Sequence, residues 1–413
     1  MEPIVFCIAF VASIIFLKWI KRIYKPSLPL PPGPKGYPII GNMFDVPSVM
    51  PWKAFQEWSK TYGDVMFLDL PGQPTVVLGS TQAAFDLLEK RSDIYSSRPT
   101  SIMYQLMFWD WNFGLMSYSP TWRNHRKEFH RFFNQREVTN YRSIQLRESR
   151  SFLRRVLTSS SGVTDDLRQD VRQIFTAIIV KITYDMDIVD FNDDYIVLAE
   201  KAAEGFSLAT VPGLFWVENF PILKYIPSWV PGTYSKKMAE YYKPIVKNMR
   251  NTPFDEIKDG MMKGEVTTPS VASTLIEKLS EESKEEHSNT IDEELARNVA
   301  AVAYAAAADT TTTAAQSFLI AMSLYPDVQR KGQDELDRVV GPNRLPEFDD
   351  YDDLVYIRAI VLESMRWMVV TPLSLPHALI REDEYRGYRI PKGSIISANV
   401  WLVLCHDPSL FKR

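Results

Sequence analysis

The longest regular pattern of apolar positions in the chain runs over Thr290–Pro326. Thr290 and Glu293 are spaced as a capping box, which satisfies free amide groups at the start of a helix. Pro326 lacks an amide hydrogen and disfavours helical geometry in the residue before it, so the helix should end there. The middle, Val299–Ala308, is apolar on nearly every side, which is typical of a helix that is buried all round.

Polar residues interrupt this helix directly after its apolar run. Asp309 is followed by four threonines, Thr310–Thr313. A buried carboxylate is costly unless it is paired or hydrogen-bonded, and helical threonines can bond back to the preceding turn. Two interpretations are open. The first is an acid–alcohol pair beside a cofactor pocket, for which the small alanines leave room. The second is a core helix with back-bonded threonines and Asp309 satisfied locally.

The first 25 residues have the pattern of a membrane anchor. Pro3–Leu17 is uncharged and apolar, and a basic cluster follows within residues 18–25. Roughly 18 apolar residues can just cross a bilayer, and a basic flank stays on the cytoplasmic side. A cleaved signal peptide would carry its positive charge before the apolar run. We therefore expect a single-pass anchor at residues 1–25 and a Pro-rich hinge at residues 26–42, with the remainder cytosolic.

Beyond the hinge, the pattern predicts mainly helices in one domain, with short strands near each end. Thr81–Lys90 should be a helix that is buried through Phe85, Leu87 and Leu88. No change of composition divides the chain into two domains. The other predicted elements are two strands in Gly63–Gly79, a helix from Ser119, helices over Arg147–Phe254 with a break at Val211–Tyr234, helices Pro326–Val340 and Tyr356–Trp367, and strands near His377 and Tyr388–Gly393.

The helix predicted to follow Ser119 carries two polar features. Trp122 and Arg126 are four residues apart and share one face, and Arg123, Lys127 and Arg131 form a basic stripe beside it. One interpretation has Trp122 and Arg126 bind an anionic cofactor group while the stripe meets an acidic partner. The other is a solvated basic helix with one packed tryptophan.

Glu363 and Arg366 form a second polar pair, three residues apart on one helical face. At the surface such a pair contributes only a few tenths of a kcal/mol. If it is buried, it needs further partners and so organises a network. A single histidine such as His377 would by itself be an ordinary polar residue.

Composition excludes several classes of protein. The chain has 413 residues with 46% hydrophobic content, enough for a substantial core. Its formal net charge of −4 argues against general nucleic-acid binding. The two cysteines, Cys7 and Cys405, are too few for a disulfide-stapled secreted fold.

The order of the motifs is more specific than any one of them. The chain carries, in this order, an apolar anchor, a basic stop, a Pro-rich hinge, WRNHR, AAADTT, ESMR and PHALIREDEYRGYRIPKGS. The same order is found in the microsomal cytochromes P-450, the haem-thiolate monooxygenases. Over Met1–Arg413 the chain resembles this family, and its fungal members most closely. The resemblance implies the cytochrome P-450 fold, mainly α with small β regions (α+β), behind a single transmembrane helix. Residues 43–413 would be an incomplete catalytic domain.

The resemblance also implies a haem b cofactor and roles for individual residues. Trp122, Arg126 and His377 would bind haem propionates through charge-assisted hydrogen bonds. Thr310 would hydrogen-bond dioxygen, and Asp309 would help relay protons for cleavage of its O–O bond. Glu363 and Arg366 would be structural. The residues placed at the haem are Trp122, Arg126, Ala306, Ala307, Thr311 and His377.

The same resemblance implies partners and a location. The basic face of Arg123, Lys127 and Arg131 would bind an NADPH-dependent reductase at the endoplasmic reticulum membrane. The aromatic segment Tyr104–Phe113 would help to roof the cavity for a lipophilic substrate. That substrate would be a terpenoid or polyketide intermediate of fungal secondary metabolism, or a xenobiotic.

Two departures from the family pattern qualify these expectations. Ala307 stands where the family usually has glycine, so the groove beside dioxygen should be tighter. The chain ends at Arg413, before the loop that carries the thiolate ligand of the iron, and neither Cys7 nor Cys405 is a convincing substitute. Three alternatives follow: an oxygenase active only in a longer form, a truncated remnant that cannot ligate haem normally, or an unrelated membrane-tethered helical binding protein.

Overall fold

The computed structural model describes residues 28–158, 165–190, 192–211, 214–230, 232–266, 268–282 and 292–406. The predicted anchor, residues 1–25, lies outside these ranges. Among the helices inside them, none combines the length and apolar composition that crossing a bilayer requires.

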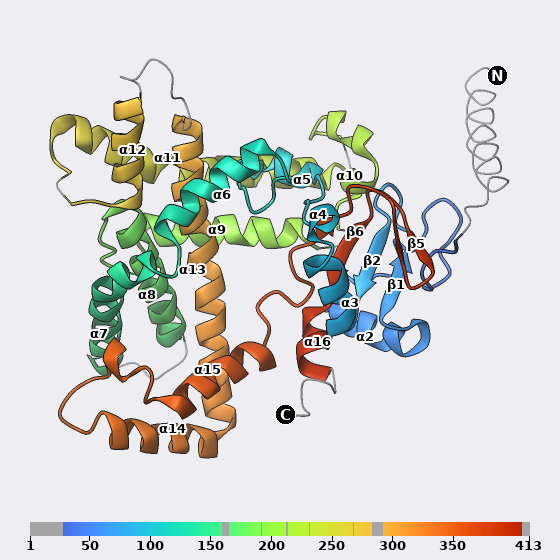
Figure 1. Ribbon diagram of the computed structural model, residues 1–413. Helices are drawn as coiled ribbons and strands as arrows, with labels where there is room; N and C mark the ends of the chain where they lie inside the picture. The colour runs from blue at the N-terminus through green and yellow to red at the C-terminus, as the bar shows by residue number, and fades with distance from the viewer. Residues whose placement is uncertain are drawn as a thin grey trace.

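Helices make up most of the described residues, and the strands gather at one side (Figure 1). The helices are α2 (Pro51–Tyr62), α3 (Thr81–Ala84), α4 (Ser92–Tyr95), α5 (Ile102–Leu106), α6 (Pro120–Phe132), α7 (Arg142–Thr158), α8 (Asp165–Tyr184), α9 (Asp194–Ala209), α10 (Trp216–Asn219), α11 (Tyr234–Lys263), α12 (Val271–Glu282), α13 (Glu293–Leu324), α14 (Pro326–Val339), α15 (Val355–Trp367) and α16 (Val400–His406). The strands are β1 (Val65–Leu68), β2 (Thr75–Leu78), β3 (His377–Ala378), β4 (Asp383–Tyr385), β5 (Tyr388–Ile390) and β6 (Ile395–Ala398).

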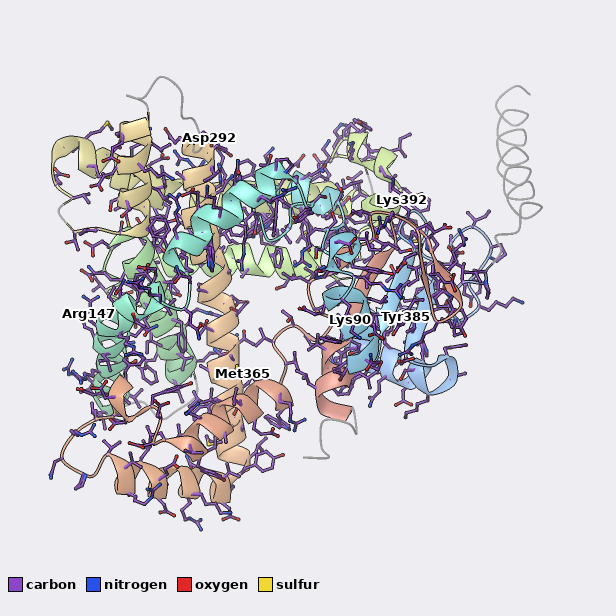
Figure 2. The ribbon with its side chains drawn as sticks, in the orientation of Figure 1. Lys90, Arg147, Asp292, Met365, Tyr385 and Lys392 are labelled. Atoms are coloured by element: carbon purple, nitrogen blue, oxygen red, sulfur yellow. The ribbon has the colours of Figure 1, made fainter. Side chains whose placement is uncertain are left out.

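The two predicted strand regions come together in one four-stranded sheet of order β1-β2-β6-β3. β1 and β2 form the predicted hairpin, and β2 then pairs in parallel with β6, with Thr75 opposite Ile395. β4 and β5 form a separate hairpin. The hydroxyl of Tyr385 in β4 donates to Asp86 at 2.9 Å, and Lys90 pairs with the same carboxylate (Figure 2). The two ends of the chain therefore build one β-rich part.

The described part of the Pro-rich hinge packs along this sheet. The amide of Phe67 in β1 donates to the carbonyl of Pro32 at 2.9 Å, and the amide of Asn42 donates to Asp69. Two glycines allow this close approach. A Cβ on Gly33 would lie 1.9 Å from the Phe67 carbonyl oxygen, and one on Gly41, at φ +55°, would lie 1.7 Å from that of Asp69.

The helix α13 is the centre of the helical part and packs against α6, α8, α9, α11 and α15. Its N-cap is Asp292, whose carboxylate accepts from the amide of Leu295 at 2.7 Å. The predicted capping box at Thr290 is therefore wrong in position, and Thr290 itself lies outside the described residues. The predicted end before Pro326 is confirmed, and Pro326 opens α14.

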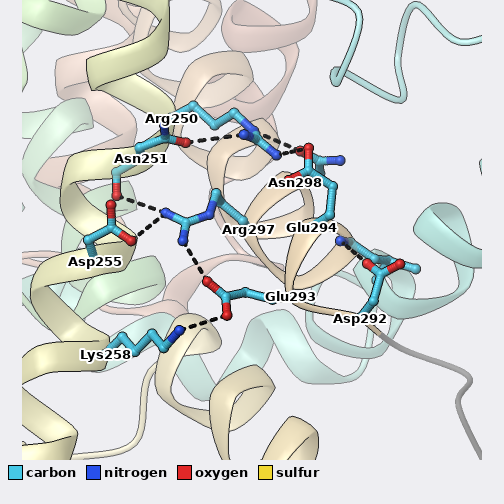
Figure 3. A network of polar contacts seen from close by, with 10 residues as sticks. Arg250, Asn251, Asp255, Lys258, Asp292, Glu293, Glu294, Arg297 and Asn298 are labelled. Carbon is cyan, nitrogen blue, oxygen red and sulfur yellow. Dashed lines mark hydrogen bonds and ion pairs between the residues drawn. The ribbon is translucent and has the colours of Figure 1, made fainter.

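Charged side chains join the first turns of α13 to α11 (Figure 3). Arg297 pairs with Asp255 on α11 and with Glu293 in its own helix, at 2.7 and 2.8 Å. Lys258 of α11 pairs with Glu293 at 2.6 Å. The network connects the N-terminal end of α13 to α11, and because its carboxylates are exposed, each pair contributes little to stability.

Local signals predicted other helices well. Ser119 caps α6 by accepting from the amide of Trp122, and Pro120 occupies the first helical position, where its missing N–H costs nothing. The prediction for Thr81–Lys90 is partly wrong. The segment is α3 followed by a π-helical turn, and Phe85 is exposed whereas Leu87 is fully buried.

Candidate functional site

The central feature of the site is an exposed stripe on the otherwise buried helix α13. Residues 299–304 are buried all round, as predicted, but the prediction fails at Ala306, which is exposed. One turn later Thr310 and Thr311 are exposed as well, and Ala307 and Asp309 are half-buried. Small side chains thus leave one face of a core helix open in its middle.

The polar side chains of this stripe support part of each interpretation that the sequence left open. The hydroxyl of Thr310 donates to the Ala306 carbonyl at 2.7 Å, and that of Thr312 donates to the Ala308 carbonyl at 2.6 Å, so these two of the four threonines are back-bonded. Asp309 has no hydrogen-bond or ion-pair partner within the described ranges. It is therefore not satisfied locally, and its carboxylate remains available.

The helix α6 carries the predicted anion-binding pair. The Trp122 ring is half-buried and lies 5.1 Å from the ring of Tyr118. Arg126 is exposed, with its guanidinium 5.9 Å from the Phe129 ring, and forms no ion pair with any residue that the structure describes. A tryptophan N–H donor and an uncommitted cation on one helical face suit an anionic group.

His377, in the short strand β3, is half-buried, and its Nδ1 lies 2.9 Å from the carbonyl oxygen of Tyr95. Burial and the nearby charge of Arg98 lower its pKa to about 4, so the imidazole is neutral near pH 7. Since Nδ1 must donate to a carbonyl, Nε2 is left as an acceptor.

Arg98 was missed as a site residue by the sequence reasoning. Its Nη1 donates to the carbonyls of Leu375 and Pro376 at 2.7 and 2.9 Å, and burial lowers its pKa. No carboxylate pairs with it in the described part of the chain. The only available signal was a basic residue at the edge of the aromatic segment, which is too common to be diagnostic.

The fold brings His377 and Arg98 close to the start of α6. Ala378, next to His377, forms a β-bridge with Ser97, which precedes Arg98. The Ser97 hydroxyl in turn accepts from the amide of Tyr118, whose ring contacts Trp122. The Trp122 side chain packs on the same apolar cluster as Ala305 and Ala307 of α13. Three segments that are distant in sequence thus come together, and α6 packs against α13, the helix that carries the exposed stripe.

The Glu363–Arg366 pair lies on α15. Arg366 donates to both Glu363 oxygens, at 2.7 and 2.5 Å, and to the Leu404 carbonyl in α16 at 2.8 Å. The pair therefore joins α15 to α16, and the bidentate contact lowers the pKa of Glu363. This agrees with a structural role.

Two further predictions concerned the basic stripe of α6 and the aromatic segment Tyr104–Phe113. Arg123, Lys127 and Arg131 are all exposed on α6, as a basic stripe requires. In the aromatic segment, Trp109 and Trp111 are buried, with ring centroids 5.6 Å apart. Much of the segment predicted as a cavity roof therefore packs into the protein core.

Comparison with known proteins decides the family. A cytochrome P450 family profile matches residues 31–413. The chain belongs to the cytochrome P450 family. Cytochrome P450 monooxygenase COX1 of Coprinopsis cinerea is 41% identical over 399 residues, which cover 95% of this chain and 76% of that protein. Tryptamine 4-monooxygenase of Psilocybe cyanescens is 37% identical over 384 residues, covering 92% and 74%.

Membership confirms the mainly helical P450 fold with small sheets and excludes the alternative of an unrelated binding protein. It implies a haem cofactor, a redox partner reductase and a lipophilic substrate, and the fungal relatives support a haem monooxygenase.

The described residues of this P450 fit haem, a flat group with two carboxylates. Small side chains leave the α13 stripe open, and the cations Arg126 and Arg98 lack carboxylate partners within the described ranges. The side chains of Cys7 and Cys405 lie outside the described part, so no iron ligand is assigned. The expectation about the cysteine loop stays a prediction.

Proposed function

We propose that this P450 is a membrane-bound monooxygenase that inserts one oxygen atom of O2 into a lipophilic organic molecule in fungal secondary metabolism. The observation that carries the proposal is the open Ala306–Thr310 stripe beside the unpaired Asp309 carboxylate. One relative, the tryptamine 4-monooxygenase, is named for a small organic substrate, which supports the metabolic part of the proposal. P450 monooxygenase ple1 of Rhodocybe pseudopiperita, 37% identical over 94% of this chain and 73% of that protein, is a further fungal monooxygenase and supports the reaction type.

Residues from three segments would hold the haem in this proposal. Trp122 and Arg126 would bind one propionate, with Arg98 as a further cation. His377 would bind the other once its Nε2 carries a proton, which an adjacent carboxylate favours. Ala306, Ala307 and Thr311 would form the surface on which the ring lies. When bound, the haem supplies the iron that activates dioxygen. The protein contributes binding, orientation and the control of protons.

Thr310 and Asp309 would control those protons. Because the Thr310 hydroxyl donates its hydrogen to Ala306, its oxygen lone pairs remain free and would accept a hydrogen bond from water or from another donor in the site. Asp309 is the adjacent acid, half-buried and uncommitted, and it can take up a proton from solvent and pass it on. Alcohol and carboxylate at successive helical positions thus form a short relay.

The location and the electron donor are parts of the same proposal. The apolar run Pro3–Leu17 and its basic flank support a single-pass anchor in the endoplasmic reticulum, with the catalytic domain in the cytosol. The exposed stripe of Arg123, Lys127 and Arg131 offers a positively charged surface to an acidic reductase.

The test is an isotope experiment with membranes that contain the full chain and an NADPH-dependent reductase. Under ¹⁸O2, a monooxygenase places one labelled atom in each oxidised product molecule, and the product requires NADPH. A labelled product that vanishes without NADPH supports the proposal. Oxygen derived from water, or no haem-dependent oxidation of any lipophilic substrate in a broad panel, contradicts it.

A further inference from the structure

A buried chain of hydrogen bonds links α11, α13 and α6. Arg250 of α11 donates from Nε to the Asn298 side chain of α13 at 2.8 Å (Figure 3). The same Asn298 side chain lies 3.1 Å from Nε2 of His125 on α6, and His125 Nδ1 lies 2.8 Å from the Thr121 carbonyl oxygen. Arg250, Asn298 and His125 are 4, 3 and 4% exposed. Water has almost no access to these groups.

The guanidinium of Arg250 fixes the direction of every hydrogen bond in this series. A guanidinium can only donate, so the Asn298 atom that it meets is the carbonyl oxygen. Asn298 therefore points its amide nitrogen at His125 and donates to Nε2. That nitrogen is then the acceptor, and Nδ1 carries the hydrogen that goes to Thr121. His125 is thus held as one tautomer of the neutral imidazole.

This bond determines how α6 is rotated about its own axis. At 3.6 residues per turn, Trp122 lies between His125, roughly 60° to one side, and Arg126, roughly 40° to the other. Glu128, further round on the buried side, pairs with Lys278 of α12 at 3.0 Å. Two directional contacts on the buried side therefore set the angle at which Trp122 and Arg126 leave the helix.

A rotation of α6 would break the hydrogen bond between Asn298 and His125. Asn298 would lose its acceptor, and its amide group would remain unpaired among the apolar side chains of the core. The Phe113 ring, 6.1 Å from that of His125, and the Phe129 ring occupy the neighbouring space and cannot replace the acceptor. The hydrogen-bonded setting of α6 is therefore strongly preferred.

We propose that His125 is a positioning residue of the haem site, and that Asn298 acts through it. The neutral imidazole sets the rotation of α6 so that Trp122 and Arg126 present their donors together to one carboxylate of the bound group. The inference rests on the proposed role of Trp122 and Arg126. It assigns a function to the histidine of WRNHR, which neither contacts the haem surface nor belongs to the basic stripe.

The test measures haem affinity of the full chain by Soret absorbance, and haem orientation by circular dichroism in the Soret band. His125→Leu removes the acceptor, and His125→Gln restores one at a similar reach. We expect His125→Leu to weaken haem binding about tenfold, the scale on which outer partners of a binding group act. Its Soret dichroism should change, and His125→Gln should recover both.

Two further variants separate positioning from loss of stability. Asn298→Leu offers His125 no hydrogen-bonding group, while Arg250 keeps Asn251 and Glu294 as partners, so it should weaken haem binding as His125→Leu does, even if the latter fails to fold. Ile257→Ala creates a cavity in the same core cluster and serves as the stability control. It should lower the unfolding temperature without changing haem affinity or the dichroism.

Each result has one meaning. Wild-type haem affinity in Asn298→Leu, or no recovery in His125→Gln, overturns the positioning role. If haem affinity merely follows unfolding temperature, so that Ile257→Ala binds as weakly as His125→Leu, the role is also overturned. Trp122→Ala with Arg126→Ala tests the underlying assignment separately. Unchanged affinity there removes the proposed propionate contacts, and the inference with them.

Discussion

The hydroxyl of Thr310 donates to the carbonyl of Ala306, one turn earlier on α13, at 2.7 Å, and both residues are exposed. The bond shows which part of the hydroxyl faces outward. Its hydrogen is committed to the helix, whereas its oxygen lone pairs are open. Such a group is suited to accept a hydrogen bond from a reacting species and to orient it.

Replacing Thr310 by alanine should uncouple electron use from product formation. The hydroxyl that orients the oxygen species is lost, so NADPH is consumed while less substrate is oxidised, by about 10²-fold, the lower end of the contribution of one proton-transfer group. The measurement is the ratio of product to NADPH oxidised in the haem-loaded enzyme. Thr313→Ala, one turn further along the same helix, is the control and should keep the wild-type ratio. An unchanged ratio in Thr310→Ala would remove Thr310 from the mechanism.

Reductase docking should depend on the basic stripe of α6. Lys127→Glu reverses one exposed charge and should slow reduction at low salt, because electrostatic steering acts on the association rate. The difference should shrink as ionic strength rises and screening shortens the range of the interaction. Lys331→Glu, exposed on α14, is the control for net charge. Equal reduction rates for the two variants at every salt concentration would exclude this face as the docking site.

Local sequence signals predicted the elements well, whereas the site depended on contacts between distant segments. Ser119 and Pro120 correctly predicted the start of α6, and Pro326 predicted the end of α13, because caps and prolines act within one helical turn. The parallel pairing of β2 with β6 joins opposite ends of the chain, and no local signal encodes it.

The exposure of Ala306 could not be predicted either. An alanine-rich run is apolar on every side, so its pattern cannot show which face the rest of the protein leaves open. The place of Arg98 in the site could not be predicted for a related reason. Its position beside His377 depends on the bridge between Ser97 and Ala378.

Glu218 of α10 should hold the start of α5 in place. Its carboxylate accepts from the Ser101 hydroxyl at 2.6 Å and from the amides of Ile102 and Met103 at 3.1 and 2.7 Å. Glu218→Gln removes the charge that strengthens these bonds. Amide exchange at Ile102 and Met103 should then become about fivefold faster, which corresponds to roughly 1 kcal/mol.

Hydrogen exchange resolved to single residues measures this effect. Glu240→Gln, an exposed carboxylate on α11, is the matched control and should leave both amides unchanged. If both variants give wild-type exchange at these two positions, Glu218 does not hold the α5 turn.

His377 should make folding stability depend on pH in a defined window. Its folded pKa of about 4 lies below the ordinary value of 6.5, so the unfolded chain takes up a proton first as the pH falls. Its contribution to stability is complete above about pH 6.5 and is lost as the pH falls toward 4. Between pH 7 and 5, wild type should lose about 1–2 kcal/mol more than His377→Asn, allowing for partial exposure.

Denaturant unfolding at the two pH values measures this difference. His377→Asn keeps a donor for the Tyr95 carbonyl, so any change reflects titration rather than a lost hydrogen bond. His130→Asn, on the exposed side of α6, reports the effect of losing a surface histidine. If the free energy of unfolding changes equally with pH in wild type and His377→Asn, the imidazole titrates alike in the folded and unfolded states, which contradicts the prediction.

The account depends most on the open face of α13, which Ala306→Phe tests directly. Because Ala306 is exposed, a phenyl group there should leave the thermal unfolding of haem-free protein unchanged, yet occupy the surface proposed for the ring. The measurement is Soret absorbance during haem titration, with Leu324→Phe at the exposed end of the same helix as control. We predict that Ala306→Phe loses haem binding while Leu324→Phe retains it. Equal haem binding by both variants would contradict the assignment of this face.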